Sequence, residues 1–288
     1  MATIIDGKAL AKKLNSQTSL RVKKLQDTNG ITPGLVVIIV GTDPASERYV
    51  RNKHRTAKRL GIYSLVRQLP DTISQSELLK IVQEYNDNPK ITGILVQDPL
   101  PKQINEKEIT RAILPEKDVD GFHPINVGKL YLDDSTNYPV ACTPKGVMTM
   151  FKEYNINLKG KNAVMIGRSA IVGKPMAALM LNAGASVSIL HLLTKDITEY
   201  TKNADIIVSA TGSLHTVTKD DVKPGAVVID VGQNINEEGH LVGDTDYADL
   251  LDKVSYITPV PGGVGPMTIA TLMQQTVDLA EWSLERGK

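Results

Sequence analysis

The sequence is poor in the residues that form disulfides, thiolate metal sites and aromatic binding surfaces. It has one cysteine and one tryptophan in 288 residues, and 4% of its residues are aromatic. A single cysteine, Cys142, excludes an internal disulfide and a metal site built from several thiolates, and it fits a reducing compartment. Such a cysteine is more often a small buried thiol than a catalytic nucleophile.

Long apolar segments and an excess of either charge are also missing. The longest apolar run, residues 35–40, is far too short to span a bilayer, and residues 1–13 have no apolar core of signal-peptide length. The 33 basic and 32 acidic residues leave a formal net charge of +1. This balance argues against nucleic acid or a membrane surface as the main partner. The missing signal peptide and membrane span predict a cytoplasmic protein.

A chain of 288 residues is longer than one compact core usually is, so we expect two α/β domains. Short apolar, β-branched runs alternate with segments of helical spacing, which predicts βαβ units with right-handed crossovers. Such runs are typical of parallel strands that are buried on both faces. The predicted strands are residues 35–40, 93–97, 163–167, 186–190, 204–210 and 226–232. The irregular stretch 121–144 is the expected domain boundary.

The segment 161–181, KNAVMIGRSAIVGKPMAALML, suits phosphate binding. A predicted strand ends at Gly167, a turn follows, and a helix begins near Gly173. The unpaired N–H groups at such a helix start favour a pyrophosphate. The spacing differs from the usual three-glycine pattern, so tight strand–helix packing explains these two glycines equally well on its own.

Neighbouring residues favour dinucleotide binding. The strands at 186–190, 204–210 and 226–232 would complete a dinucleotide fold. Arg168 and Ser169 lie in the turn, where a guanidinium and a hydroxyl could hold a phosphate, although Arg168 could also be a solvated surface residue. The next strand ends in His191 and Leu192, without the acidic residue that accepts the ribose hydroxyls of NAD. This absence favours NADP.

A second set of chemical groups follows the strand at 35–40. Asp43 can cap a helix that begins at Pro44, at the carboxyl end of that strand. Tyr49 and Lys53 are four residues apart and share one face of this helix. Taken alone, such a pair is more often solvated than functional, but the ends of other strands supply further polar groups.

Gln97 and Asp98 follow the strand at 93–97, and the segment PEKDVDGFHP carries Asp118, Asp120 and His123. Ligands of open parallel sheets bind at the carboxyl ends of the strands. Asp118, Asp120 and His123 lack the spacing of a calcium loop, so we do not expect a metal site here. We expect instead a carboxylate that binds substrate or caps a turn.

The segment ITPVPGGVGPMT, residues 257–268, combines rigid prolines with glycines that allow close backbone approach. It suits a loop that closes over a flat ligand, or an ordinary tight connection. From Pro266 onward, the apolar spacing predicts a long helix that packs back on the first domain. Its expected buried face contains Ile269, Leu272, Met273, Thr276 and Ala280.

Together these segments resemble one family over nearly the whole chain: the bifunctional methylenetetrahydrofolate dehydrogenase/methenyltetrahydrofolate cyclohydrolases. The motifs that carry the resemblance are VGTDPASERYVRNK, GILVQDPLP, PEKDVDGFHP, CTPKG, IGRSAIVGKPMA, VIDVG and ITPVPGGVGPMT. The resemblance implies NADP-dependent oxidation of 5,10-methylenetetrahydrofolate, then hydrolysis of the methenyl product to 10-formyltetrahydrofolate. This one-carbon metabolism supplies purine synthesis. It also implies a cytoplasmic homodimer paired through Rossmann-type domains.

The resemblance assigns roles to particular residues. It implies that Lys53 is the central catalytic residue, that Tyr49 stacks on the aminobenzoyl ring of the folate, that Gln97 tunes the lysine and that Asp120 holds the pterin. The implied substrate-binding residues are Tyr49, Lys53, Val96, Gln97, Asp98, Asp120, Pro261, Gly262, Gly263, Val264 and Gly265. The implied cofactor-binding residues are Gly167, Arg168, Ser169, Gly173, Leu192, Thr211 and Gln233.

The implied domains are a catalytic folate-binding domain at 1–140, completed by the helix at 266–288, and an NAD(P)-binding Rossmann-type domain at 141–265. Four residues depart from the family pattern. Asp98 stands where leucine is usual and adds a carboxylate beside Lys53. Ala170 and Leu192 replace an asparagine and a serine near the cofactor, which leaves NAD possible, and Gln233 replaces an isoleucine.

Two other functions remain open at this point. The chain could be another two-domain dinucleotide dehydrogenase, for a keto or amino acid, with Lys53 as general base. It could also be a dinucleotide-binding protein without chemistry. The set Tyr49, Lys53, Gln97 and Asp120 argues against the latter, because a binder needs no amine beside its ligand.

Overall fold

The computed structural model describes residues 1–286 and divides into two compact units. Unit 1 contains Met1–Lys12 and Thr143–Thr268, and unit 2 contains Lys13–Cys142 and the described residues from Ile269 onward. Residues 287 and 288, the end of the predicted C-terminal helix, lie outside the described part of the chain. The functional division expected from the sequence, at residues 140 and 265, stays a prediction.

Unit 2 is built on a three-stranded parallel sheet in the order β3-β2-β4. The central strand β2 (Gly34–Val40) is buried along its whole length, and β4 (Gly93–Gln97) lies beside it. Both were predicted from their apolar runs. The third strand, β3 (Tyr63–Leu69), was not predicted, because it lies at the sheet edge and its sequence YSLVRQL mixes polar and apolar residues.

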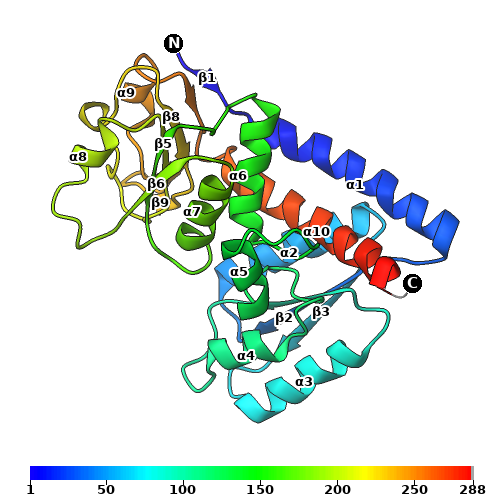
Figure 1. The fold of residues 1–288 in the computed structure, drawn as a ribbon. Coiled ribbons are helices and arrows are strands. Elements are labelled where there is room, and N and C mark those ends of the chain that lie inside the picture. Colours follow the sequence, from blue (N-terminus) through cyan, green and yellow to red (C-terminus); the bar gives the residue numbers. More distant parts are fainter. Residues whose placement is uncertain (287–288) are drawn as a thin grey trace. The chain divides into compact units, whose positions relative to one another are not determined.

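Helices cover both faces of this sheet (Figure 1). The odd-numbered residues of β2 pack in a core with α1 (Gly7–Asn29), α2 (Pro44–Arg59) and α10 (Val264–Arg286). The even-numbered residues pack in a second core with α3 (Gln75–Asp87) and α4 (Glu106–Ala112). A strand alternates its side chains between two faces, so one apolar run supplies both cores. Each fully buried Val or Ile contributes roughly 1.5–3 kcal/mol.

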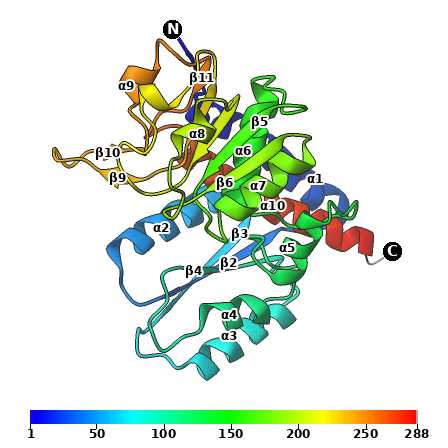
Figure 2. The same cartoon turned by 60° about the vertical axis from the view of Figure 1, so that its left-hand side comes forward.

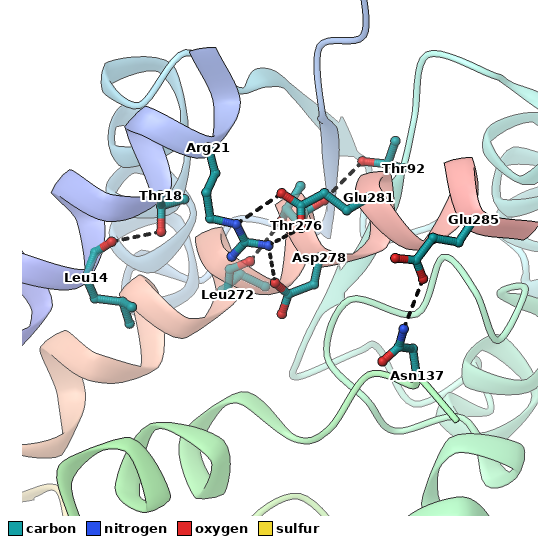
Figure 3. Close-up of polar contacts among 10 residues, drawn as sticks. All are labelled: Leu14, Thr18, Arg21, Thr92, Asn137, Leu272, Thr276, Asp278, Glu281 and Glu285. Carbon is teal, nitrogen blue, oxygen red and sulfur yellow. Dashed lines mark hydrogen bonds and ion pairs between the residues drawn. The ribbon is translucent and has the colours of Figure 1, made fainter. Parts of the chain in front are cut away.

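From Ile269 onward, helix α10 belongs to unit 2, and Figure 3 shows its polar contacts there. The Arg21 guanidinium on α1 donates to Asp278 at 2.6 Å and to Glu281 at 2.7 Å, and the Asn137 amide donates to Glu285 at 3.2 Å. The predicted packing of the C-terminal helix on the first domain is confirmed. The helix is buried around most of its circumference from Met267 to Ala280, and not along one face alone.

Unit 1 contains a six-stranded parallel sheet in the order β1-β11-β8-β7-β5-β6. The strands are β1 (Thr3–Ile4), β5 (Asn162–Ile166), β6 (Ser186–Leu190), β7 (Ile206–Ser209), β8 (Val227–Asp230) and β11 (Tyr256–Ile257). Four of them were predicted, with β7 and β8 shorter than expected. The expectation that all strands are buried on both faces is wrong for β6, which lies at the edge and is partly exposed.

The sheet order reverses at β5, whose sequence neighbour β6 lies on one side and β7 on the other. Helix α7 (Gly173–Asn182) packs on β5 and β6, as Figure 2 illustrates. The remaining elements of unit 1 are α6 (Cys142–Glu153), α8 (Thr198–Thr201), a 3₁₀ helix at Lys219–Asp221, the hairpin strands β9 (Asn234–Ile235) and β10 (Leu241–Val242), and α9 (Tyr247–Leu250). The α/β fold class predicted from the sequence is confirmed.

The stretch 121–144 is less irregular than its composition suggests, because it contains α5 (Pro124–Tyr131). His123 Nδ1 accepts a hydrogen bond from the Ile125 N–H at 3.1 Å, and Pro124 fixes the first helical residue. Cys142 is a buried thiol, as expected. Among the described helices, none combines the length and the apolarity that a membrane-spanning segment needs.

Candidate active site

Helix α2 begins where the sequence predicted. The Asp43 carboxylate accepts a hydrogen bond from the Ser46 N–H at 2.7 Å, which satisfies one of the unpaired donors at the helix start. The helix therefore begins at the carboxyl end of β2. Tyr49 is 41% exposed, and Lys53, one turn later, is partly buried.

Lys53 contacts the last residue of β4. Its Nζ donates a hydrogen bond to Gln97 Oε1 at 2.9 Å, and Gln97 Nε2 donates to the Asp98 carbonyl oxygen at 2.8 Å. Ser46 Oγ donates to the same carbonyl oxygen at 3.3 Å. The structure thus brings together two residues that are 44 positions apart in the sequence.

The segment that carries Asp118 and Asp120 runs beside β4 through a parallel bridge between Ile94 and Asp118. The buried Asp118 carboxylate accepts from the N–H groups of Gly121, at 3.1 Å, and His123, at 2.7 Å. Asp118 and His123 therefore stabilise this turn and the start of α5. Asp120 is the carboxylate of the motif that can meet a ligand.

Asp98 and Asp120 line the same pocket in unit 2. Burial raises the pKa of Asp98 to about 6, with a further increase from Glu106 and an opposing effect of Lys53. Burial also raises the pKa of Asp120 to about 7, again opposed by Lys53. The remaining wall is mostly apolar and contains Ile94, Val96, Leu100, Ile109, Ile113 and Phe122.

This arrangement suits a flat heterocycle that has N–H donors on one edge and apolar faces. Glu106, Leu100 and Phe122 were not among the site residues predicted from the sequence. Phe122 follows the DVDG motif directly and could have been noticed. Glu106 and Leu100 belong to a helix and a loop whose path the sequence pattern does not predict.

In unit 1, the turn between β5 and α7 requires its two glycines. Gly167 has φ +117°, and a Cβ there would lie 2.5 Å from the Ala210 carbonyl oxygen. A Cβ on Gly173 would lie 2.2 Å from the Gly167 carbonyl oxygen. The backbone therefore makes a close turn into the start of α7, as a dinucleotide phosphate site needs.

The side chains of this turn are exposed at Arg168 and Ser169. Ser169 Oγ accepts hydrogen bonds from the N–H groups of Val172, at 3.1 Å, and Gly173, at 3.2 Å. Ser169 thus stabilises the start of α7. The sequence had predicted only a phosphate contact for this residue. Because its hydroxyl accepts both bonds, its own O–H hydrogen can still be donated to a ligand.

The other predicted cofactor residues lie along the carboxyl edge of the same sheet. Thr211 follows β7, next to Gly167, where the strand order reverses. Leu192 follows β6 and is fully exposed, and Gln233 follows β8. Ligands of open α/β sheets bind at such a reversal point. The close glycine turn and this edge fit an NAD(P) molecule.

The segment 261–265, predicted as a loop, is partly helical. Pro261 to Gly263 form the turn, and Val264 and Gly265 are the first residues of α10. The Gly262 carbonyl oxygen accepts from the Lys8 N–H at 2.9 Å, and a Cβ on Gly263 would lie 2.5 Å from the Pro259 carbonyl oxygen. The glycines therefore allow tight packing within unit 1.

The predicted site residues thus form two groups. Unit 2 brings together Tyr49, Lys53, Val96, Gln97, Asp98 and Asp120 near the ends of β2 and β4. Unit 1 brings together Gly167, Arg168, Ser169, Gly173 and Thr211. In residues 1–286, no group of three or more His, Cys, Asp or Glu side chains is arranged to hold a metal ion.

Two family models match the chain. The model described as "Tetrahydrofolate dehydrogenase/cyclohydrolase, catalytic domain" matches residues 5–120. The model described as "Tetrahydrofolate dehydrogenase/cyclohydrolase, NAD(P)-binding domain" matches residues 141–284. Together they account for most of the chain and include both groups of site residues.

Similar proteins span the full length of the chain. It is 58% identical over 287 residues to the "Bifunctional protein FolD" of Levilactobacillus brevis, covering 100% of this chain and 99% of the relative. It is 60% identical over 283 residues to the protein of the same name from Lactiplantibacillus plantarum, covering 98% of this chain and 99% of the relative.

Solved structures agree. The bifunctional FolD enzyme of Campylobacter jejuni has a TM-score of 0.96 and 48% identity, with 98% of this chain and 100% of that chain covered. The Trypanosoma brucei enzyme, in complex with NADP and an inhibitor, has a TM-score of 0.93 and 36% identity, with 98% of each chain covered. This chain belongs to the tetrahydrofolate dehydrogenase/cyclohydrolase family.

Proposed function

We propose that the protein is a bifunctional folate enzyme. It oxidises 5,10-methylenetetrahydrofolate to 5,10-methenyltetrahydrofolate with NADP and then hydrolyses the product to 10-formyltetrahydrofolate. The observation that carries the proposal is the hydrogen bond between Lys53 and Gln97 beside a pocket whose lining includes Asp98 and Asp120. Family membership supports both activities.

The pocket in unit 2 supports recognition of the pterin ring. Asp120 accepts hydrogen bonds from the pterin N–H groups, and the apolar residues of the wall contact the ring faces. Tyr49 lies one turn before Lys53 on α2, where its ring can stack on the aminobenzoyl group. Val96 and Asp98 complete the proposed substrate contacts of unit 2, and the segment 261–265 of unit 1 stays a predicted substrate contact.

Gly167, Arg168, Ser169, Gly173, Leu192, Thr211 and Gln233 are the proposed cofactor contacts. When bound there, NADP supplies the oxidant that accepts a hydride from the methylene carbon. The exposed Arg168 guanidinium pairs with the 2′-phosphate, and the start of α7 receives the pyrophosphate. Leu192 offers the phosphate no hydrogen bond, so use of NAD is part of the proposal.

Lys53 moves a proton during hydrolysis. Water adds to the cationic methenyl carbon and loses a proton, which leaves a hydroxyl group on that carbon. N5 of the folate then gains a proton and its bond to the carbon breaks, while the hydroxyl loses its proton to form the formyl C=O, so that one proton is released overall. The product carries the formyl group on N10. The side-chain oxygen Oε1 of Gln97 holds the Lys53 Nζ in one place, so that the amine can carry a proton between the attacking water and N5.

One assay tests the function. The purified protein is incubated with methylenetetrahydrofolate and NADP, and separately with NAD, while the absorbance of the methenyl product is followed. We expect transient methenyl formation with NADP and then its decay to the formyl product. A dehydrogenase for a keto or amino acid would form no methenyl product from this folate. A dinucleotide-binding protein without chemistry would reduce neither NADP nor NAD.

The proposal includes a cytoplasmic homodimer. The support for the dimer is β6, an edge strand with Ile189 42% exposed and, on the adjacent helix, Leu181 60% exposed. Exposed apolar edge strands commonly pair with another chain. Light scattering should give twice the 31.3 kDa of one chain, and Ile189→Lys should give the mass of one. The single buried thiol supports a reducing compartment.

A further inference from the structure

Two buried carboxylates lie at the carboxyl ends of β7 and β8 in unit 1, and neither belongs to the proposed set of ligand contacts. Asp244 is 0% exposed and Asp230 is 1% exposed. An ionised carboxylate at such depth is stable only when protein groups replace the water that it has lost. The groups that surround Asp244 therefore indicate what it does.

Every side-chain contact of Asp244 comes from a hydrogen-bond donor. Its Oδ2 accepts from Ser209 Oγ at 2.9 Å, from the Thr211 N–H at 2.7 Å and from Thr211 Oγ1 at 2.9 Å. Its Oδ1 accepts from Asn234 Nδ2 at 3.0 Å. Two of these donors, a backbone amide and a side-chain amide nitrogen, cannot reverse their polarity. The position requires an anion or a group that only accepts.

Asp230 holds the segment that contains Asp244. Its Oδ1 accepts from the N–H groups of Gly232, at 2.9 Å, and Asp244, at 3.0 Å, while Oδ2 accepts from the Thr245 N–H at 2.8 Å. A Cβ on Gly232 would lie 2.0 Å from Asp244 Oδ1. The two carboxylates thus tie residues 209–211, 230–234 and 243–245 to one another.

We propose that Asp244 is a positioning residue for the dinucleotide. It fixes the backbone of Thr211 and the segment that carries Gln233, two of the proposed cofactor contacts, at the place where the sheet order reverses. The inference rests on the proposed function and extends it to a residue that touches no ligand. A preorganised edge reduces the conformational entropy that is lost when the cofactor binds.

The test uses Asp244→Asn, which keeps the size of the side chain but puts an NH₂ group against donors. We expect the KM for NADP to rise about tenfold or more, from the loss of one or two hydrogen bonds at about 1.4 kcal/mol per factor of ten. Hydrolysis of methenyltetrahydrofolate, assayed without cofactor, should stay within about twofold of wild type.

Asp205→Asn is the matched control. Asp205 lies at the amino end of β7, where its carboxylate accepts from the Asn162 N–H at 2.9 Å and from Lys223 Nζ at 2.7 Å. The variant removes a hydrogen-bonded carboxylate, with its side chain 28% exposed, at the opposite edge of the same sheet. Its KM for NADP should change less than about twofold.

Equal increases in KM in the two variants, or a parallel loss of hydrolysis in Asp244→Asn, would overturn the assignment, because either result means general loosening of the fold. If Asp244→Asn does not fold, Asn234→Ala removes one donor to Oδ1 and should raise the KM about threefold. Calorimetric titration of NADP into wild type and variants keeps this test separate from the proposed reaction. A wild-type protein that binds NADP but does not oxidise the folate would refute the function alone.

Discussion

Lys53 Nζ lies 2.9 Å from Gln97 Oε1, and the orientation of the Gln97 amide follows from its other end. A carboxamide has one acceptor atom and one donor group. Because Gln97 Nε2 donates to the Asp98 carbonyl oxygen at 2.8 Å, the oxygen must point toward the lysine. The end of β4 therefore fixes both the place and the polarity of the group that meets the amine.

Replacing Gln97 should weaken hydrolysis without abolishing it. In Gln97→Ala the lysine loses its fixed acceptor, and we expect kcat for methenyltetrahydrofolate hydrolysis to fall about 10- to 100-fold. Gln83→Ala is the control, since Gln83 is exposed on α3 and its side-chain amide donates to Asp87. A wild-type kcat in Gln97→Ala would show that the Gln97 amide has no role in hydrolysis.

Asp98 should make stability depend on pH. Its folded-state pKa of about 6 lies above that of an unfolded aspartate, so the folded protein loses stability as pH rises from about 4 to about 6. Asp98→Asn removes this penalty. After allowance for partial exposure to solvent, the variant should be about 1 kcal/mol more stable than wild type at pH 7.

The advantage of Asp98→Asn should vanish at about pH 3, below the pKa of both states, where the folded and the unfolded wild type both hold the proton. Urea denaturation at several pH values measures this difference. A constant difference from pH 4 to pH 7 would show that Asp98 does not titrate as the pocket geometry requires.

Arg168 should control the choice of cofactor. The guanidinium is exposed in the turn before α7, so its removal leaves no buried charge unpaired. Arg168→Ala should raise the KM for NADP about 10- to 100-fold and leave that for NAD nearly unchanged, since only NADP carries the 2′-phosphate. Lys161→Ala, at the amino end of β5, provides the control. Equal losses with both cofactors would exclude the phosphate contact.

The contact between α1 and α10 should matter for stability. Arg21 pairs at 2.6 Å with Asp278, whose side chain is 11% exposed, and Arg21→Met removes the guanidinium from this contact. We expect the free energy of unfolding to fall by about 2 kcal/mol. The exposed Arg51–Glu47 pair, at 3.4 Å, gives the comparison: Arg51→Met should cost less than about 0.5 kcal/mol. Similar losses of unfolding free energy in the two variants would show that burial of the Arg21–Asp278 pair does not increase its contribution to stability.

The central strands and the start of α2 could be predicted from the sequence because local chemistry determines them. The apolar run of β2 supplies both cores of unit 2, and Asp43 with Pro44 defines the start of α2. Strand β3 could not be predicted, since a half-exposed edge strand needs no apolar pattern.

The candidate site could be predicted only in part. Helical spacing places Tyr49 and Lys53 on one face, but nothing local says which acidic residue of DVDG meets a ligand. That depends on Asp118 accepting bonds from Gly121 and His123, a consequence of how the loop folds back. Asp244 gave no signal either, because its partner Thr211 is 33 residues away.

The most direct test of the account is hydrolysis of methenyltetrahydrofolate by Lys53→Met, with Lys58→Met, an exposed lysine on the same helix, as the control. The loss of methenyl absorbance is followed in the absence of cofactor. We predict that Lys53→Met reduces the rate by about 10²–10⁴-fold and that Lys58→Met leaves it unchanged. A Lys53→Met enzyme that hydrolyses at the wild-type rate, with its fold intact by circular dichroism, would contradict the proposed chemistry.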